Sequence, residues 1–264
     1  MTDTPAPPSA ADALRFAFGT LTVLPVRLTR WDRAAARGGM LCAPLAGLVV
    51  GLCAAAVGLA LLLLGGGPLL AAVGTAAVPA VLTRGLHLDG LADTADGLGS
   101  AKPAADALRI MKQSDIGPFG VLTLLFTVLA QVAALAEAYG GSWVRGAVAA
   151  AVAAAVSRAA LTLASRAGVP AARPEGLGAA VAESVPRRAA LLCAALVTAG
   201  CAAAGALFGP YGALHAALAA VAGLGLGELV LRHCRRRFGG VTGDVFGALA
   251  ESAGLTALVA FALG

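Results

Sequence analysis

Two long stretches without a charged residue constrain this chain more than any other feature of its sequence. Residues 38–83 and residues 189–227 contain no Asp, Glu, Lys or Arg. A helix needs about 20 apolar residues to cross a bilayer, so each stretch is long enough for two passes. Across the 264 residues, 59% are hydrophobic and only 12% are charged, against about 45–50% and about 25% in soluble domains. The sequence therefore predicts a polytopic membrane protein and excludes disorder or a disulfide scaffold.

Glycine and proline breaks divide these stretches into shorter segments. We expect spans at Leu41–Leu64, Leu69–Thr83, Ile116–Ala138, Trp143–Ser165, Ala189–Phe208, Tyr211–Leu231 and Phe246–Leu263. The second and the last are short, and a partly re-entrant course is the alternative for each. The predicted fold class is thus all-α: one integral membrane helical bundle over residues 1–264, with about seven transmembrane helices and a range of six to eight.

The basic residues indicate how the bundle is oriented. Of the 19 Lys and Arg residues, all except Arg145 and Arg158 precede the first expected span or lie in the loops after the second, fourth and sixth. Such loops mark the cytoplasmic side of a membrane. We therefore expect these loops to face the cytoplasm at the inner membrane, with residues 1–38 as a cytoplasmic or interfacial segment. This placement next to membrane lipid explains the net charge of +5, so no nucleic-acid partner is needed to account for it. The sequence leaves open whether the protein forms a homo-oligomer.

The acidic residues gather after the second expected span, in residues 84–115, which we expect to be a cytoplasmic active-site loop. Asp89, Asp93 and Asp96 are spaced i, i+4 and i+7, so on a helix they project from one face. Carboxylates this close repel one another unless a cation lies among them. Oxygen ligands suit Mg²⁺ or Mn²⁺ that bridges to substrate phosphates. We predict a metal site of these three aspartates, and a solvated acidic loop is the alternative.

Other residues are candidates for contact with an anionic substrate. Arg109 and Lys112 share a helix face and would neutralise a diphosphate, although positive-inside charge also explains them. Arg158 lies inside the fourth span, where an arginine normally faces a polar cavity, and pairing with Glu137 is the structural alternative. The remaining candidates are His87 and Arg173 for substrate contact, Gly240, Thr242 and Gly243 for cradling a phosphate, and Asp244 and Glu251, with Lys112, for catalysis.

The segment Gly85–Gly97 closely resembles the signature of the cobalamin synthase family, the adenosylcobinamide-GDP ribazoletransferases. Three further segments agree in order and spacing: Arg109–Lys112, Ala172–Gly178, and Gly239–Asp244 followed by Glu251. The opening residues 18–26 are similar as well. The resemblance covers nearly the whole chain.

This resemblance implies an integral membrane, Mg²⁺-dependent transferase that acts late in coenzyme B12 biosynthesis. Such an enzyme would join adenosylcobinamide-GDP to α-ribazole or its 5′-phosphate and release GMP. Asp89, Asp93 and Asp96 would hold Mg²⁺ against the diphosphate. Asp244 or Glu251 would complete the metal site or accept the proton of the attacking hydroxyl.

Two other functions are weighed against this one. A CDP-alcohol phosphatidyltransferase would also place aspartates at a membrane face, but its signature needs an Ala-Arg pair where Asp93-Thr94 stands. A cation-coupled transporter could use Asp89, Asp93, Asp244 and Arg158 as an ion path. Its carboxylates should then lie at mid-bilayer depth, whereas most of these lie where loops meet spans.

Overall fold

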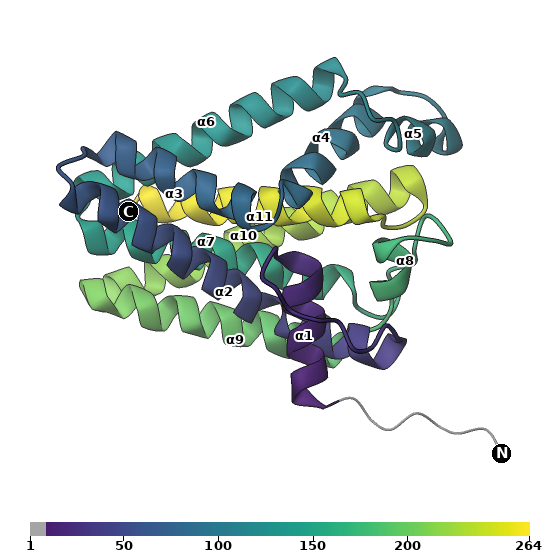
Figure 1. The fold of residues 1–264 in the computed structure, drawn as a ribbon, viewed down its shortest axis with the longest axis horizontal. Coiled ribbons are helices and arrows are strands. Elements are labelled where there is room, and N and C mark those ends of the chain that lie inside the picture. Colours follow the sequence, from purple (N-terminus) through teal and green to yellow (C-terminus); the bar gives the residue numbers. More distant parts are fainter. Residues whose placement is uncertain (1–8) are drawn as a thin grey trace.

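The chain folds into a bundle of long helices, described for residues 9–264 in a computed structural model. Its α-helices are α1 (Ala10–Leu21), α2 (Arg33–Leu63), α3 (Pro68–Leu82), α4 (Leu86–Gly99), α5 (Ala104–Ile110), α6 (Pro118–Gly141), α7 (Trp143–Ala164), α8 (Leu177–Val181), α9 (Arg187–Gly205), α10 (Gly209–Phe238) and α11 (Gly243–Ala262), with a short 3-10 helix, η1 (Ala206–Phe208). Figure 1 shows the long helices running side by side. The predicted all-α fold is confirmed.

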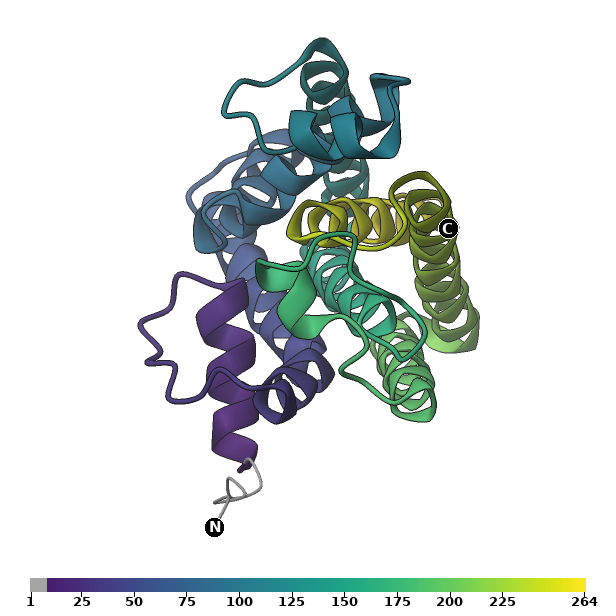
Figure 2. The same cartoon turned by 90° about the vertical axis from the view of Figure 1, so that its right-hand side faces the viewer.

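The connections between the long helices lie at two ends of the bundle. The tight turns α2–α3, α6–α7 and α9–α10 lie at one end, and α4, α5, α8 and the α10–α11 connection lie at the other (Figure 1). We call the second end the basic end, because its segments carry the clustered Lys and Arg residues. Figure 2 looks along the long helices from this end, with α8 near the centre.

The number of spans is close to the predicted one. Five helical stretches among the described residues are long and apolar enough to cross a membrane, and the bent pair of α3 and α4 raises this number to six. One of these five stretches, Arg187–Phe238, is counted once, although it contains both α9 and α10. These two helices pack against each other, and the chain turns between them at Gly209, where φ is 85°. The protein is therefore a multi-pass membrane protein, as predicted.

Residues 84–115, expected as a cytoplasmic loop whose aspartates share a helix face, contain the helices α4 and α5. After α3 the chain turns by 86° into α4, and Gly85 makes this turn with φ at 70°. Backbone groups that pack against other helices need hydrogen-bond partners, and a helix supplies them internally. This arrangement matters for function, because α4 packs against α11 and α6 and so fixes its acidic side chains.

Glycines allow α4 to cross α11 at very short distance. A Cβ atom at Gly90 would lie 2.6 Å from the backbone oxygen of Asp244, and one at Gly247 would lie 2.7 Å from the backbone oxygen of His87. Real Cβ atoms are essentially never this close to another heavy atom. The first turns of α4 and α11 therefore lie in direct backbone contact.

The other end of α4 is attached to the start of α6 through Asp96. Its two carboxylate oxygens accept hydrogen bonds from the backbone N–H groups of Gly117, at 2.8 Å, and Gly120, at 2.9 Å. A carboxylate at a helix N-terminus satisfies free N–H groups and is stabilised by the helix dipole. A Cβ at either glycine would lie 2.5 Å from a carboxylate oxygen, so the glycines make this contact possible.

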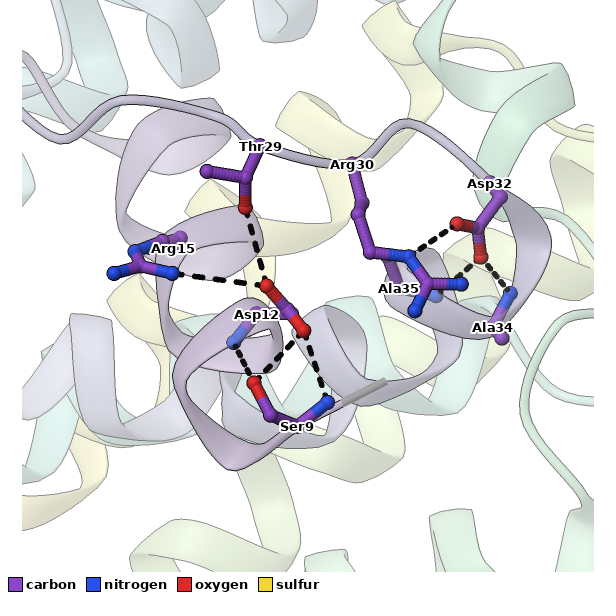
Figure 3. A network of polar contacts seen from close by, with 8 residues as sticks. All are labelled: Ser9, Asp12, Arg15, Thr29, Arg30, Asp32, Ala34 and Ala35. Atoms are coloured by element: carbon purple, nitrogen blue, oxygen red, sulfur yellow. Dashed lines mark hydrogen bonds and ion pairs between the residues drawn. The ribbon is translucent and has the colours of Figure 1, made fainter. Parts of the chain in front are cut away.

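The segment before α2 is held by a polar network (Figure 3). Asp12 accepts hydrogen bonds from Ser9, which caps α1, and from the hydroxyl of Thr29 at 3.1 Å. Asp32 caps α2 and accepts from the backbone N–H of Ala35 at 3.0 Å. The bonds from Ser9 lower the pKa of Asp12, and the bond from Ala35 lowers the pKa of Asp32. Helix α1 thereby lies across α2, roughly perpendicular to the long helices (Figures 1 and 2).

Candidate active site

Two adjoining cavities open at the basic end. The larger, about 370 Å³, is lined by Lys112, Arg173, Glu175, Gly176, Leu177, Thr242, Gly243 and Asp244. The smaller, about 110 Å³, is mostly apolar and includes His87 and Asp89 in its wall. Leu177, Gly243 and Asp244 line both cavities. The beginning of α11 therefore separates a polar chamber from an apolar one.

Asp244, in the first turn of α11, is held by two neighbours. The Nη1 atom of Arg173 donates to Asp244 Oδ2 at 3.2 Å, and the hydroxyl of Thr242 donates to the same oxygen at 3.1 Å. Thr242 also caps α11 by accepting from the backbone N–H of Val245. The other guanidinium nitrogen of Arg173 donates to the carbonyl of Leu108, which fixes this arginine from a second side.

The glycine-rich segment before α11 serves close approach of backbones. A Cβ at Gly240 would lie 2.4 Å from the carbonyl oxygen of Pro170, and Val241 exchanges backbone hydrogen bonds with Pro170 and Ala172 at 2.9 and 2.8 Å. This pairing brings Arg173 next to Asp244. Of the three residues predicted to cradle a phosphate, Thr242 and Gly243 line the larger cavity and Gly240 does not.

Three carboxylates, those of Asp89, Asp93 and Asp244, lie near enough to interact electrostatically where α4 meets α11. Helix α4 is the second half of the bent pair that forms the sixth candidate span, and it lies at the basic end (Figure 1). Asp93 is partly buried, and the negative charges of Asp89 and Asp244 act on it. Carboxylates this close repel one another unless a proton or a cation reduces their negative charge. This cluster therefore favours a bound cation.

The residues fit a cation that arrives together with a phosphate. Among residues 9–264, no group of three or more His, Cys, Asp or Glu side chains stands ready to hold a metal ion. Asp96 departs from the predicted set because α6 already occupies both its oxygens. Mg²⁺ in phosphate-transfer sites is usually held by one or two carboxylates plus substrate phosphates and waters. Asp89 and Asp93 suit that arrangement, and metal binding by the predicted aspartates stays a prediction.

The structure brings only some of the other predicted residues to the cavities. Lys112 lines the larger cavity, where its Nζ lies 3.0 Å from Glu175 Oε1. Arg109 is exposed and binds Asp106 on its own helix at 2.7 Å. Arg158 and Glu251 lie deeper in the bundle and line a separate cavity of about 70 Å³. Arg109, Arg158 and Glu251 therefore do not join the site at the basic end.

Comparison with known proteins identifies the family. A family model described as cobalamin-5-phosphate synthase matches residues 13–262. The chain belongs to this family. Curated relatives named adenosylcobinamide-GDP ribazoletransferase include one from Frankia casuarinae, 44% identical over 94% of both chains. Another, from Nocardioides sp., is 44% identical over 95% of this chain and 98% of its own. A third, from Stutzerimonas stutzeri, is 40% identical over 95% and 97%.

Membership of the cobalamin-5-phosphate synthase family makes the chain a transferase of cobalamin biosynthesis. It favours this activity over the phosphatidyltransferase and the transporter. No solved structure matches the chain.

Sequence reasoning missed three features of this transferase site. Glu175, Gly90 and Gly247 received no role, yet Glu175 lines the larger cavity and the two glycines set the distance between α4 and α11. A signal existed for Gly90, because it directly follows an acidic residue inside the family-like segment. Gly247 stands in an apolar helix and carried no signal in the sequence.

Proposed function

We propose that this enzyme joins adenosylcobinamide-GDP to α-ribazole, or to its 5′-phosphate, with Mg²⁺ as cofactor and with release of GMP. The observation that carries the proposal is the presence of opposite charges around two adjoining cavities that share Asp244. Asp89, Asp93 and Asp244 form an acidic cluster, while Arg173 and Lys112 lie at the adjoining wall. The printed names of the relatives support these substrates.

The reaction is a transfer at phosphorus. A ribazole hydroxyl attacks the diphosphate phosphorus that is attached to the cobinamide, and a new P–O bond forms. The bond from this phosphorus to the bridging oxygen breaks, and its electron pair leaves with GMP. Such reactions depend mainly on positioning and on neutralising charge. Asp89 and Asp93 would hold Mg²⁺, and the bound ion would neutralise the charge of the diphosphate.

The side chains of the larger cavity have separate roles in this proposal. Arg173 and Lys112 bind the phosphate groups and stabilise the negative charge that develops on GMP. Gly243, at the beginning of α11, offers the helix N-terminus to a phosphate oxygen, while Thr242 caps this end and holds Asp244. Of the two carboxylates considered as proton acceptor, Asp244 lines both cavities and Glu251 lines neither. We therefore propose that Asp244 accepts the proton of the attacking hydroxyl.

The proposal is tested with purified protein in liposomes supplied with adenosylcobinamide-GDP, α-ribazole and Mg²⁺. We expect GMP release that a chelator abolishes, and a loss of roughly 100-fold or more in kcat for Asp93→Asn. Asp106→Asn is the matched control, because Asp106 lies on α5 and pairs with exposed Arg109. Absence of GMP release from folded wild-type protein would refute the proposed activity.

We further propose that the basic end faces the cytoplasm, as the positive-inside rule indicates. Labelling of single cysteines in a cysteine-free background tests this, with Arg109→Cys at the basic end and Gly67→Cys at the opposite end. Both positions are exposed. The first should react with a membrane-impermeant reagent only from the cytoplasmic side and the second only from outside. The reverse pattern would overturn the orientation.

A further inference from the structure

A third cavity lies inside the bundle, away from the two at the basic end. It measures about 70 Å³, and its wall is mostly apolar. Two opposite charges nevertheless face it, Arg158 from α7 and Glu251 from α11, together with the amide of Gln131 and the hydroxyl of Ser157. Charged groups inside a membrane bundle are costly and usually have a function. The site at the basic end does not use these two.

The two charges face each other without touching. Glu251 accepts a hydrogen bond from Gln131 at 2.7 Å, and Arg158 donates to Ser157 at 3.1 Å. Arg158 and Glu251 form no direct ion pair in the described part of the chain, although their charges attract across the cavity. A water needs about 10–15 Å³ and two or more polar partners. The cavity offers both, so water molecules can bridge the guanidinium and the carboxylate.

Arg158 also reaches the helix that carries the acidic cluster. It is only 3% exposed, and its Nη2 atom lies 3.3 Å from Nδ1 of His87, in the first turn of α4. A guanidinium donates hydrogen bonds and cannot accept them, so Nδ1 of His87 is the acceptor. His87 precedes Asp89 by two residues, and both line the smaller cavity. Gly47 of α2 leaves room for this arginine, because a Cβ there would lie 3.1 Å from Arg158 Cδ.

We infer that Glu251, bridging water and Arg158 form a charge-balanced link that holds His87, and with it α4, in the position the acidic cluster requires. The link runs from α11 through α7 to α4. Glu251 and Arg158 are thus positioning residues, and neither contacts the substrate. The inference uses the proposed function only for its activity readout.

A double-mutant cycle tests whether the two charges are coupled. Glu251→Gln leaves Arg158 uncompensated inside the bundle, and Arg158→Gln does the same to Glu251. Each should lower the Tm of the detergent-solubilised protein by roughly 10 °C. The double variant should lose clearly less than the sum, because it leaves no unpaired charge. Additive losses would overturn the inference.

The matched control is Glu228→Gln. This carboxylate pairs with Arg166 and Arg232 and does not line the interior cavity. Combined with Arg158→Gln, it should give losses in Tm that add. If a single variant of the cycle fails to accumulate in the membrane, accumulation of the double variant replaces Tm as the readout. Recovery then supports the inference, and failure of the double variant contradicts it.

Kinetics separate positioning from a direct role in proton transfer. Glu251→Gln should lower kcat by roughly 10- to 100-fold through displacement of α4, with KM for α-ribazole little changed. Glu251→Asp should restore most of this loss, because one more water fills the space left by the shorter side chain. Equal damage from both variants, with loss of the acid limb of the pH–rate profile, would make Glu251 the proton acceptor and refute the inference. Failure of the wild-type assay alone would refute the proposed function and leave the Tm cycle intact as a test.

Discussion

Replacing Gly90 by alanine tests whether the crossing of α4 and α11 sets the geometry of the site. The new Cβ would lie 2.6 Å from the backbone oxygen of Asp244 and 2.9 Å from its Cα, where ordinary contacts begin near 3.4 Å. Both atoms belong to backbone, so neither can turn away. The two helices must separate by several tenths of an ångström.

The expected magnitudes distinguish stability from activity. Alanine is about 1 kcal/mol better than glycine inside a helix, whereas overpacking costs about 1–3 kcal/mol. The net loss in the free energy of unfolding is therefore small, and Tm should fall by only a few degrees, given about 2–4 °C per kcal/mol. A displacement of about 1 Å can lower a rate by about 100-fold. We expect Gly90→Ala to lose most of its activity while it stays folded.

GMP release and thermal unfolding are measured on the same purified sample. Gly225→Ala in α10 is the matched control, because a Cβ at Gly225 meets nothing within 4 Å. This control should keep full activity and an equal or higher Tm. Wild-type activity in Gly90→Ala would show that the distance between α4 and α11 does not govern the site.

Three further predictions concern the ends of helices. Asp96→Asn leaves one N–H group of α6 without its charged acceptor and should reduce the free energy of unfolding by about 1–3 kcal/mol, measured by thermal denaturation. Thr242→Val removes the cap of α11 and should cost about 1 kcal/mol, and an unchanged Tm, or equal loss in Thr242→Ser, would contradict this. Hydrogen bonds lower the pKa of Asp12 and Asp32 below the ordinary value of 3.8. Their stabilisation is therefore complete above pH 3.8 and is lost as the pH falls through the lowered folded values. Acid should then change the fluorescence of Trp31, which packs against Phe16 of α1, and Asp12→Asn should reduce this change.

The membrane bundle could be predicted because spans depend on local composition. A run of apolar residues without charge has few alternatives to a bilayer helix, and the tight glycine turns marked where the chain reverses. Helix α4 could not be predicted in the same way. The spacing of its aspartates fits a helix, but its packing depends on contact with α11 at Gly90 and Gly247. Such a contact between distant segments leaves no periodic signal.

The acidic cluster was predicted in part, for a geometric reason. Spacing of i, i+4 and i+7 places Asp89, Asp93 and Asp96 on one face, but a helix rises 1.5 Å per residue, so the first and last are about 10 Å apart along the axis. One ion cannot bridge that length. In the structure the first two interact electrostatically with Asp244 of α11, and Asp96 binds the start of α6 instead. Helical spacing shows which side chains project in the same direction, but it does not bring them to the same level along the helix axis.

The same argument separates Asp244 from Glu251. They are seven residues apart on α11, so the face is shared while the depths differ by about 10 Å. Asp244 therefore lines the cavities at the basic end, and Glu251 lines the one inside the bundle. Helix α4 touches both levels, because Gly90 packs on Asp244 and His87 binds Arg158. A change of charge in the interior cavity should thus alter kcat through α4 without changing which side chains contact the substrate.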